Sequence, residues 1–367
     1  MTGKVLNYYA GGNTARGFHN LFDECLTGLD RLFILKGGPG TGKSSLMKSI
    51  GREWNEKGYD IELLHCSSDN KSIDGVIIPK LKVGIVDGTA PHVIEPKMPG
   101  VVEEYVNLGT AWDAEELKKH KKEIARYISE ASGAFQSAYS CFQEALEIHD
   151  VWEEIYIDNI DFEKANELTD QLIQKLFAHH TGEKAVVKHR FLGAATPKGA
   201  VDFVPNLTED IPHRYFIKGR PGSGKSTMLK KIAAAAEEKR FEVEVYHCGF
   251  DPNSLDMIIV RELGFAIFDS TAPHEYFPSR EGDEVIDMYE LIITPGTDEK
   301  YAKEIREVSI RYKSKMNEAI SFLAKAKAVR DKLERIYIKA MDFSKVDAYK
   351  DEIQREIEKI EQVIVQK

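Results

Sequence analysis

The chain has 367 residues, enough for two or three domains of ordinary size, and its 42% hydrophobic and 30% charged residues make a globular composition. The formal net charge of −10 disfavours nucleic acid as a partner, because binding to nucleic acid requires a basic surface. No apolar run reaches membrane-spanning length and the first residues do not resemble a signal peptide, so we expect a cytoplasmic protein with no membrane partner.

The sequence contains one pattern twice, with an offset of 182 residues. The segment GGPGTGKS at 37–44 recurs as GRPGSGKS at 219–226, and DGTAPH at 87–92 recurs as DSTAPH at 269–274. A repeat of this length is a duplicated domain rather than a solenoid. We therefore predict a first domain over 1–183 and a second over 184–367.

Each copy predicts strands that alternate with a helix. In the first copy, apolar runs at 32–35, 61–66 and 83–86 predict buried strands, and the spacing of the apolar residues predicts a helix over 43–57. The second copy predicts the same elements, with strands at 215–217, 243–248 and 265–268. Strands that alternate with helices indicate an α/β fold, in which each copy forms a mainly parallel sheet flanked by helices.

Each copy ends in a helical extension. Apolar residues spaced by three, four or seven predict long amphipathic helices within about 113–180 and 298–365, and an Asp-Phe turn at 161–162 and again at 342–343 starts a shorter returning helix. One interpretation is a cap on the sheet. The alternative is a projecting arm that contacts a protein partner.

Two glycine-rich segments have the pattern G-x-x-x-x-G-K-[ST] between a predicted strand and a predicted helix, which predicts a phosphate-binding loop. Glycines let backbone N–H groups turn inward around a phosphate, and the helix directs its positive end toward it. We expect Lys43 and Lys225 to contact the β- and γ-phosphates and to take part in catalysis. The predicted nucleotide-binding residues are Gly37, Gly38, Pro39, Gly40, Thr41, Gly42, Lys43, Ser44 and Ser45, and Gly219, Arg220, Pro221, Gly222, Ser223, Gly224, Lys225, Ser226 and Thr227. The predicted fold is therefore a pair of duplicated P-loop NTPase domains.

The same loops predict a magnesium site in each half. Ser44 and Ser226 offer a hydroxyl oxygen, and Asp87 and Asp269 each end the apolar strand that follows the loop, where P-loop folds hold Mg²⁺. The next residue is not acidic in either copy: Gly88 or Ser270 stands where many ATPases have a catalytic glutamate. Hydrolysis is therefore expected to be slow, or to depend on a group from elsewhere.

Two duplicated pairs are candidates for that group. Asp69 and Asp251 follow the second strand of each copy, and His92 and His274 lie five residues after the metal aspartates. Either pair could orient water or contact a substrate, and either could be a structural turn residue.

A cation also recurs ahead of the first predicted strand, as Arg16 in one copy and Lys198 in the other. One hypothesis is that Arg16 and Lys198 contact a phosphate of the nucleotide bound in their own half or in the other half. The alternative is that they are solvated turn residues.

The paired loops, each followed by His-Cys and by D-[GS]-T-A-P-H, resemble a bacterial family of tandem P-loop proteins known mainly as predicted ATPases or ATP-binding proteins. The resemblance covers nearly the whole chain and implies ATP binding at 37–44 and 219–226. No guanine-reading motif is present, which also favours ATP.

Three functions remain open from the sequence. The first is a Mg²⁺-dependent ATP hydrolase or ATP-driven switch whose two domains move relative to each other. The second is a phosphotransferase, most plausible in the second half, where Arg220, Arg261 and Arg280 could neutralise phosphates. The third is a regulatory or scaffold module that binds ATP without hydrolysing it. The absence of a glutamate directly after Asp87 and Asp269 favours this third function.

Overall fold

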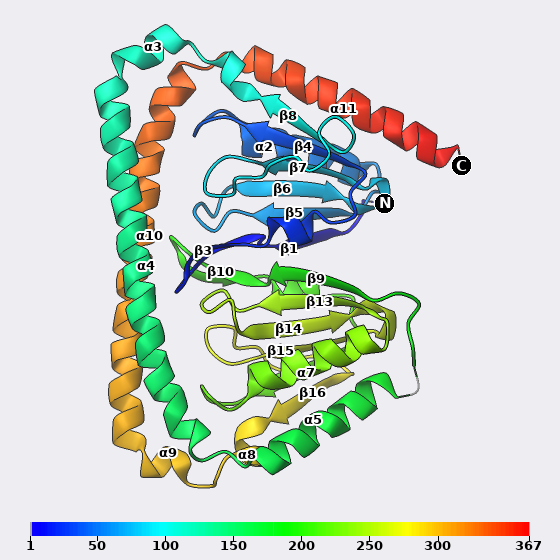
Figure 1. Ribbon diagram of the computed structural model, residues 1–367, viewed down its shortest axis with the longest axis vertical. Coiled ribbons are helices and arrows are strands. Elements are labelled where there is room, and N and C mark those ends of the chain that lie inside the picture. The colour runs from blue at the N-terminus through cyan, green and yellow to red at the C-terminus, as the bar shows by residue number, and fades with distance from the viewer. Residues whose placement is uncertain (1, 179, 367) are drawn as a thin grey trace.

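The computed structural model describes residues 2–178 and 180–366. Each half of the chain forms one six-stranded sheet, and two long helices run beside both sheets (Figure 1). The α/β class and the duplication predicted from the sequence are confirmed at this level.

The first sheet is mixed, because one of its six strands, β6, runs antiparallel to both of its neighbours. The remaining neighbours in the sheet are parallel to each other. In sheet order the strands are β1 (Val5–Tyr8), β5 (Ile61–His65), β6 (Ile73–Ile78), β7 (Val83–Asp87), β4 (Arg31–Lys36) and β8 (Glu103–Asn107). The three predicted strands correspond to β4, β5 and β7, whereas β1, β6 and β8 were not predicted.

The second sheet repeats this arrangement, with β14 as the reversed strand. Its strands, in sheet order, are β16 (Asp283–Asp287), β12 (His213–Lys218), β15 (Phe265–Asp269), β14 (Leu255–Val260), β13 (Glu242–His247) and β9 (Val186–Phe191). Each half adds a two-stranded ribbon, formed by β2 (Gly11–Thr14) with β3 (Gly17–Asn20), and by β10 (Gly193–Thr196) with β11 (Gly199–Asp202).

One helix packs directly on each sheet after the glycine-rich segment. These helices are α2 (Lys43–Glu56), close to the predicted range 43–57, and its equivalent α7 (Lys225–Glu238). Leu46, Ile50 and Trp54 of α2 recur at helical spacing and are fully or nearly fully buried against the sheet. Short helices complete the body: α1 (Phe22–Cys25), α6 (Val204–Leu207), α8 (Met288–Ile292), α9 (Thr297–Lys300), and the 3₁₀ turns η1 (Pro79–Leu81), η2 (Leu108–Ala111) and η3 (Arg261–Leu263).

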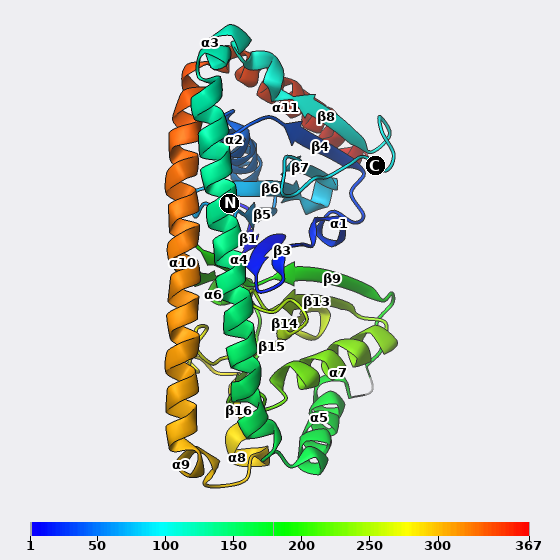
Figure 2. The ribbon, with the colours of Figure 1, turned by 60° about the vertical axis from the view of Figure 1, so that its left-hand side comes forward.

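The predicted extensions form an antiparallel pair of long helices. They are α4 (Lys121–Ile157), preceded by the short α3 (Ala114–Lys119), and α10 (Ala302–Lys339). Figure 2 shows them side by side along the full height of the molecule. At mid-length the pair packs on the tips of both ribbons, where Ala15 and Ala195 share one apolar cluster with Phe142 and Leu323. The pair therefore lies along the body and does not project away from it.

The shorter helices after the two Asp-Phe turns cross to the other half. Helix α5 (Phe162–Phe177) begins after Asp161 in the first half of the chain, and its Leu172 and Phe177 are buried in the core of the second half. Helix α11 (Phe343–Val365) belongs to the second half, and its Ile353 and Ile357 are buried in the core of the first. The two halves thus exchange their terminal helices.

The two sheets meet edge to edge at β1 and β9. Tyr9 and Phe191 form an isolated antiparallel bridge, in which each backbone N–H donates to the other's carbonyl over 3.0 Å. Beside it the guanidinium of buried Arg190 lies 2.9 Å from Glu62 of the first half and 3.6 Å from Glu244 of its own half. An apolar cluster that includes residues of both sheets continues this junction.

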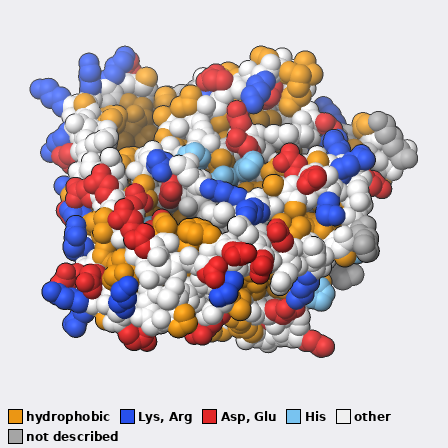
Figure 3. All heavy atoms as spheres, turned by 60° about the horizontal axis from the view of Figure 1, so that its bottom comes forward, with side chains coloured by type: hydrophobic (Ala, Val, Ile, Leu, Met, Phe, Trp, Pro, Cys, Tyr) orange, Lys and Arg blue, Asp and Glu red, His pale blue; other side chains and the backbone are white. Residues whose placement is uncertain are grey.

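No helix among the described residues has both the length and the apolar character required to cross a membrane. On the face drawn in Figure 3, acidic and basic side chains are interspersed rather than separated into single-sign areas.

Candidate functional site

The glycine-rich segment of each half is a loop between the central strand and the helix that follows it. Gly40 and Gly42 have φ of 71° and 87°, and the equivalent Gly222 and Gly224 have φ of 74° and 83°. These left-handed conformations favour glycine, which explains why both copies have glycine at these positions. The two loops therefore have the same backbone path.

The strand register brings the predicted aspartates to the loops. Leu35 of β4 pairs with Asp87 of β7, one residue before the strand ends at Lys36, and Ile217 pairs with Asp269 in the same way. A carboxylate at the carboxyl end of the neighbouring parallel strand therefore lies beside the first residues of the loop.

The lysine of each loop faces this carboxylate. Lys43 Nζ lies 3.6 Å from Asp87 Oδ2, and Lys225 Nζ lies 3.6 Å from Asp269 Oδ2. Lys43 Nζ also donates to the carbonyls of Gly37 and Gly38 over 2.7 and 2.8 Å. Burial lowers the pKa of Lys43, although the charge of Asp87 opposes this change. The predicted lysine and aspartate are thus together in both halves.

The loop hydroxyls have two different environments. Ser44 Oγ and Ser226 Oγ each accept a hydrogen bond of 3.0 Å from the first residue of the reversed strand, Ile73 or Leu255. Buried Thr41 instead donates to Gly38 within the loop. The predicted binding residues Ser45 and Thr227 are exposed on the first turn of the helices.

Each loop is covered by the long helix of the other half. A Cβ atom at Gly40 would lie 2.9 Å from the carbonyl oxygen of Glu334 in α10, and a Cβ at Gly222 would lie 2.5 Å from that of Glu153 in α4. Burial raises the pKa of both glutamates. Because α10 belongs to the second half and α4 to the first, both sites contain residues from both halves.

Asp69 and Asp251, predicted to orient water, are held by local and cross-half contacts. Asp69 accepts from the backbone N–H of Lys71 over 3.0 Å and from Ser72 Oγ, and its carboxylate lies 3.5 Å from Lys327 Nζ of α10. Asp251 accepts from Arg16 Nε of the first half over 2.8 Å. Arg16 therefore reaches the other half, where its observed partner is a carboxylate.

His92 and His274 are buried and paired with carboxylates. His92 Nε2 lies 3.5 Å from Asp74 Oδ2 in β6, and among the described residues its Nδ1 has no hydrogen-bond partner. His274 Nδ1 instead lies 2.8 Å from Asp202 in β11. Burial alone would lower the pKa of each histidine, but the neighbouring carboxylates raise both. Both imidazoles are thus held inside the protein, where the charges of Asp87 and Asp269 act on them.

The reversed strands contribute a carboxylate that the site prediction did not include. Asp74 and its equivalent Asp256 are 4% and 7% exposed, and an oxygen of each has no hydrogen-bond partner among the described residues. Asp256 is the counterpart of Asp74 at the 182-residue offset, and this repetition was the one sign in the sequence that they could belong to the site. Their position beside the loop could not be predicted, because the reversed strands themselves were not predicted.

The arginines of the second half, considered for a phosphotransferase, have other partners. Arg220 lies 2.7 Å from Asp298, and Arg261 lies 2.6 Å from Glu244. Arg280 donates to three backbone carbonyls of the segment 208–211.

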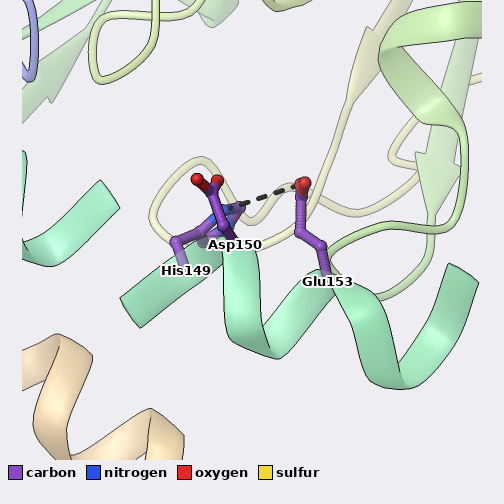
Figure 4. Close-up of side chains that lie close together, drawn as sticks. All are labelled: His149, Asp150 and Glu153. Carbon is purple, nitrogen blue, oxygen red and sulfur yellow. Dashed lines mark ion pairs between the residues drawn. The ribbon is translucent and has the colours of Figure 1, made fainter. Parts of the chain in front are cut away.

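A further group of polar side chains lies on α4 beside the second loop (Figure 4). His149, Asp150 and Glu153 bring one potential ligand atom each within 4.8 Å of one another, and His149 Nδ1 lies 3.6 Å from Glu153 Oε1. Burial lowers the pKa of His149, which favours its neutral form. This cluster contacts the second site from the first half of the chain.

No family model, no curated protein and no solved structure matches this chain. The resemblance to tandem P-loop proteins stays a prediction from the sequence.

Proposed function

We propose that the protein is a Mg²⁺-dependent ATP hydrolase with two P-loop nucleotide sites. The observation that carries the proposal is the repeated geometry of lysine, aspartate and glycine loop: 3.6 Å separates Lys43 from Asp87 and Lys225 from Asp269, beside loops of the same backbone path. A lysine and inward backbone N–H groups at a helix start are suited to bind a polyphosphate.

The donor atoms beside each loop also suit magnesium. A serine hydroxyl starts the helix and a carboxylate ends the neighbouring strand, and Mg²⁺ prefers such oxygen ligands. When bound, the ion would neutralise charge on the phosphate oxygens. In each half, Ser44 and Asp87 or Ser226 and Asp269 would hold it, while Lys43 or Lys225 exchanges its present carbonyl partners for phosphate oxygens.

The experiment is nucleotide binding and phosphate release by the full chain and three variants: Lys43→Ala, Lys225→Ala and the double variant. We expect two ATP molecules per wild-type chain in calorimetry, one in each single variant and none in the double. Asp87→Ala and Asp269→Ala should each remove the Mg²⁺ dependence of one site. One ATP per wild-type chain would reject one of the two sites.

A second candidate is an ATP-binding module that does not hydrolyse ATP. The favouring observation is that Gly88 and Ser270 follow the metal aspartates, and their carbonyls accept hydrogen bonds from Lys36 and Lys218. No carboxylate occupies this position to orient water. Binding of two ATP molecules without phosphate release would support this candidate, whereas release that depends on Lys43 or Lys225 supports the hydrolase.

The phosphotransferase receives less support than at the sequence level, since Arg220, Arg261 and Arg280 are held by carboxylates or carbonyls. A switch in which the two domains move relative to each other is also less favoured, because the halves share a buried core and exchange helices.

A further inference from the structure

The two sites differ at one position of the long helix that covers each loop. Glu334 of α10 contacts the first loop as Glu153 of α4 contacts the second, so the two helices correspond with an offset of 181 residues. One helical turn before each glutamate, α10 has Arg330 and α4 has His149. At equivalent positions, the helix that covers the first site therefore has a permanent cation, Arg330, and the helix that covers the second site has an imidazole, His149.

Arg330 faces the first site. Its neighbours one turn away on the same helix face are Lys327, which lies 3.5 Å from Asp69, and Glu334, which covers Gly40. The guanidinium charge also acts on Lys43, Asp74 and His92, whose pKa values it lowers. Three groups of the site thus lie within electrostatic range of Arg330.

The guanidinium of Arg330 forms no hydrogen bond or ion pair with any residue that the structure describes, although the side chain is half-buried. It lies 6.0 Å from the ring centre of Phe135. Arg330 and Lys43 act on each other as like charges, and although the guanidinium charge also acts on the carboxyl groups of Asp74 and Glu334, neither forms an ion pair with it. The arrangement suits a ligand with several negative charges, such as a triphosphate.

His149 does not supply this charge in the second site. Burial lowers its pKa, and the nearby charge of Lys225 lowers it further, while the carboxylates of Asp150 and Asp251 oppose the change. The ring also packs against the aromatic rings of Phe250, Tyr312 and Trp152. At this position of the covering helix, the second site therefore has an imidazole where the first site has a guanidinium.

We infer that Arg330, supplied by the second half of the chain, contacts the terminal phosphate of the nucleotide at the first loop, and that the first site accounts for most of the ATP turnover. The inference rests on the proposed function. In hydrolysis the oxygen of water bonds to the γ-phosphorus, and the bond to the β,γ-bridging oxygen breaks. ADP leaves with that electron pair, and the proton of the water passes to solvent. A guanidinium stabilises the negative charge that develops in this step.

The experiment measures steady-state phosphate release from Mg²⁺–ATP by the full chain carrying Arg330→Ala, Arg330→Gln or Arg330→Lys. We expect Arg330→Ala and Arg330→Gln to lower kcat by about a hundredfold or more, with a smaller change in KM, and Arg330→Lys to restore part of the loss. Arg306→Ala, at an exposed position of the same helix, is the matched control and should retain wild-type turnover. The unfolding midpoint of each variant shows that it is folded.

The reciprocal variant tests the inequality of the two sites. In a Lys43→Ala background, where only the second loop is intact, His149→Arg should increase phosphate release at least tenfold. Wild-type turnover in Arg330→Ala, combined with loss of turnover in Lys43→Ala, would overturn the inference and leave the proposed function intact. Wild-type turnover in both Lys43→Ala and Lys225→Ala would instead reject the proposed function.

Discussion

The equivalent aspartates Asp74 and Asp256 show how one residue type takes opposite roles in two copies of a fold. Both lie on the reversed strand and are buried. His92 pairs with Asp74, whereas His274 pairs with Asp202, a residue that is Asn20 in the first half. Asp256 therefore lacks the close cationic partner that Asp74 has.

The two carboxyl groups differ in pKa accordingly. Burial raises the pKa of Asp256 to about 6, and the charge of Asp269 raises it too, against the opposing charge of His274. For Asp74, burial also acts to raise the pKa, but the charge and hydrogen bonding of His92, together with Cys66 and the charge of Arg330, outweigh burial, and the net shift of the pKa is downward.

We predict that Asp256→Asn stabilises the protein at pH 7.5. A carboxyl whose pKa is raised on folding stabilises the native state below its unfolded pKa of about 3.9, and this contribution is lost as the pH rises through about 6. The expected increase in the free energy of unfolding is up to about 3 kcal/mol at pH 7.5 and falls to nothing near pH 4. Urea unfolding of wild type and variant at both pH values measures it.

Asp74→Asn is the matched variant, and it should lower the free energy of unfolding rather than raise it. The lowered pKa of Asp74 stabilises the fold above about pH 4, and the raised pKa of His92 stabilises it until the pH rises through the folded value. Removing one member of this buried pair should cost about 3–5 kcal/mol at pH 5.5. Equal effects of the two substitutions at every pH would contradict the assignment of partners.

The lysine and aspartate of each site could be predicted from the sequence. Lys43 and Asp87 lie together because β4 and β7 are parallel neighbours, so the end of β7 lies beside the loop that follows β4. The order of strand, loop and second strand along the sequence is enough to predict this. Arg330 could not be predicted, because it is about 290 residues from the first loop and reaches it through helix packing. A spacing pattern contains no information on which half a helix will cover.

The same limit applies at the scale of elements. Helical periodicity predicts α4, α5, α10 and α11, and the Asp-Phe turns predict where α5 and α11 begin, after the capping residues Asp161 and Asp342. Both signals are local in the sequence. The shorter helices were expected to return, but α4 and α10 are long enough to carry them to the opposite end of the molecule (Figure 1). Apolar residues of α5 and α11 can cover either sheet, since the two sheets are copies of each other.

We predict that a cavity in α11 loosens the first half, although α11 comes from the second. Ile357 is buried in the core that contains Leu46 and Ile50 of α2, so Ile357→Ala should cost about 2–5 kcal/mol and increase hydrogen exchange in α2 before α7. Val363, 56% exposed on the same helix, is the control, because Val363→Ala removes little buried surface.

Leu172→Ala in α5 is the reciprocal change. Leu172 is buried with Met228 and Leu229 of α7, so its removal should increase exchange in α7 first. If Ile357→Ala instead increased exchange first in α7, the exchanged packing of the terminal helices would be wrong.

At the scale of the whole molecule, three features join the halves: the exchanged helices, the edge-to-edge bridge of β1 and β9, and the apolar cluster shared by both sheets. Buried Arg190 adds a charged contact, because its guanidinium lies between Glu62 of the first half and Glu244 of the second. A half that unfolded alone would expose apolar surface on the other half and leave buried carboxylates without their cation.

We therefore predict that the two sequence halves unfold together in one transition. Trp54 is buried in the core of the first half, and Trp152 packs against the core of the second. Two variants that each retain one of these tryptophans, with the others changed to phenylalanine, should report the same thermal midpoint. Arg190→Ala should lower both midpoints equally, by an amount equivalent to about 3–5 kcal/mol. Separate midpoints for Trp54 and Trp152, with only one of them shifted by Arg190→Ala, would show that the halves are independent folding units.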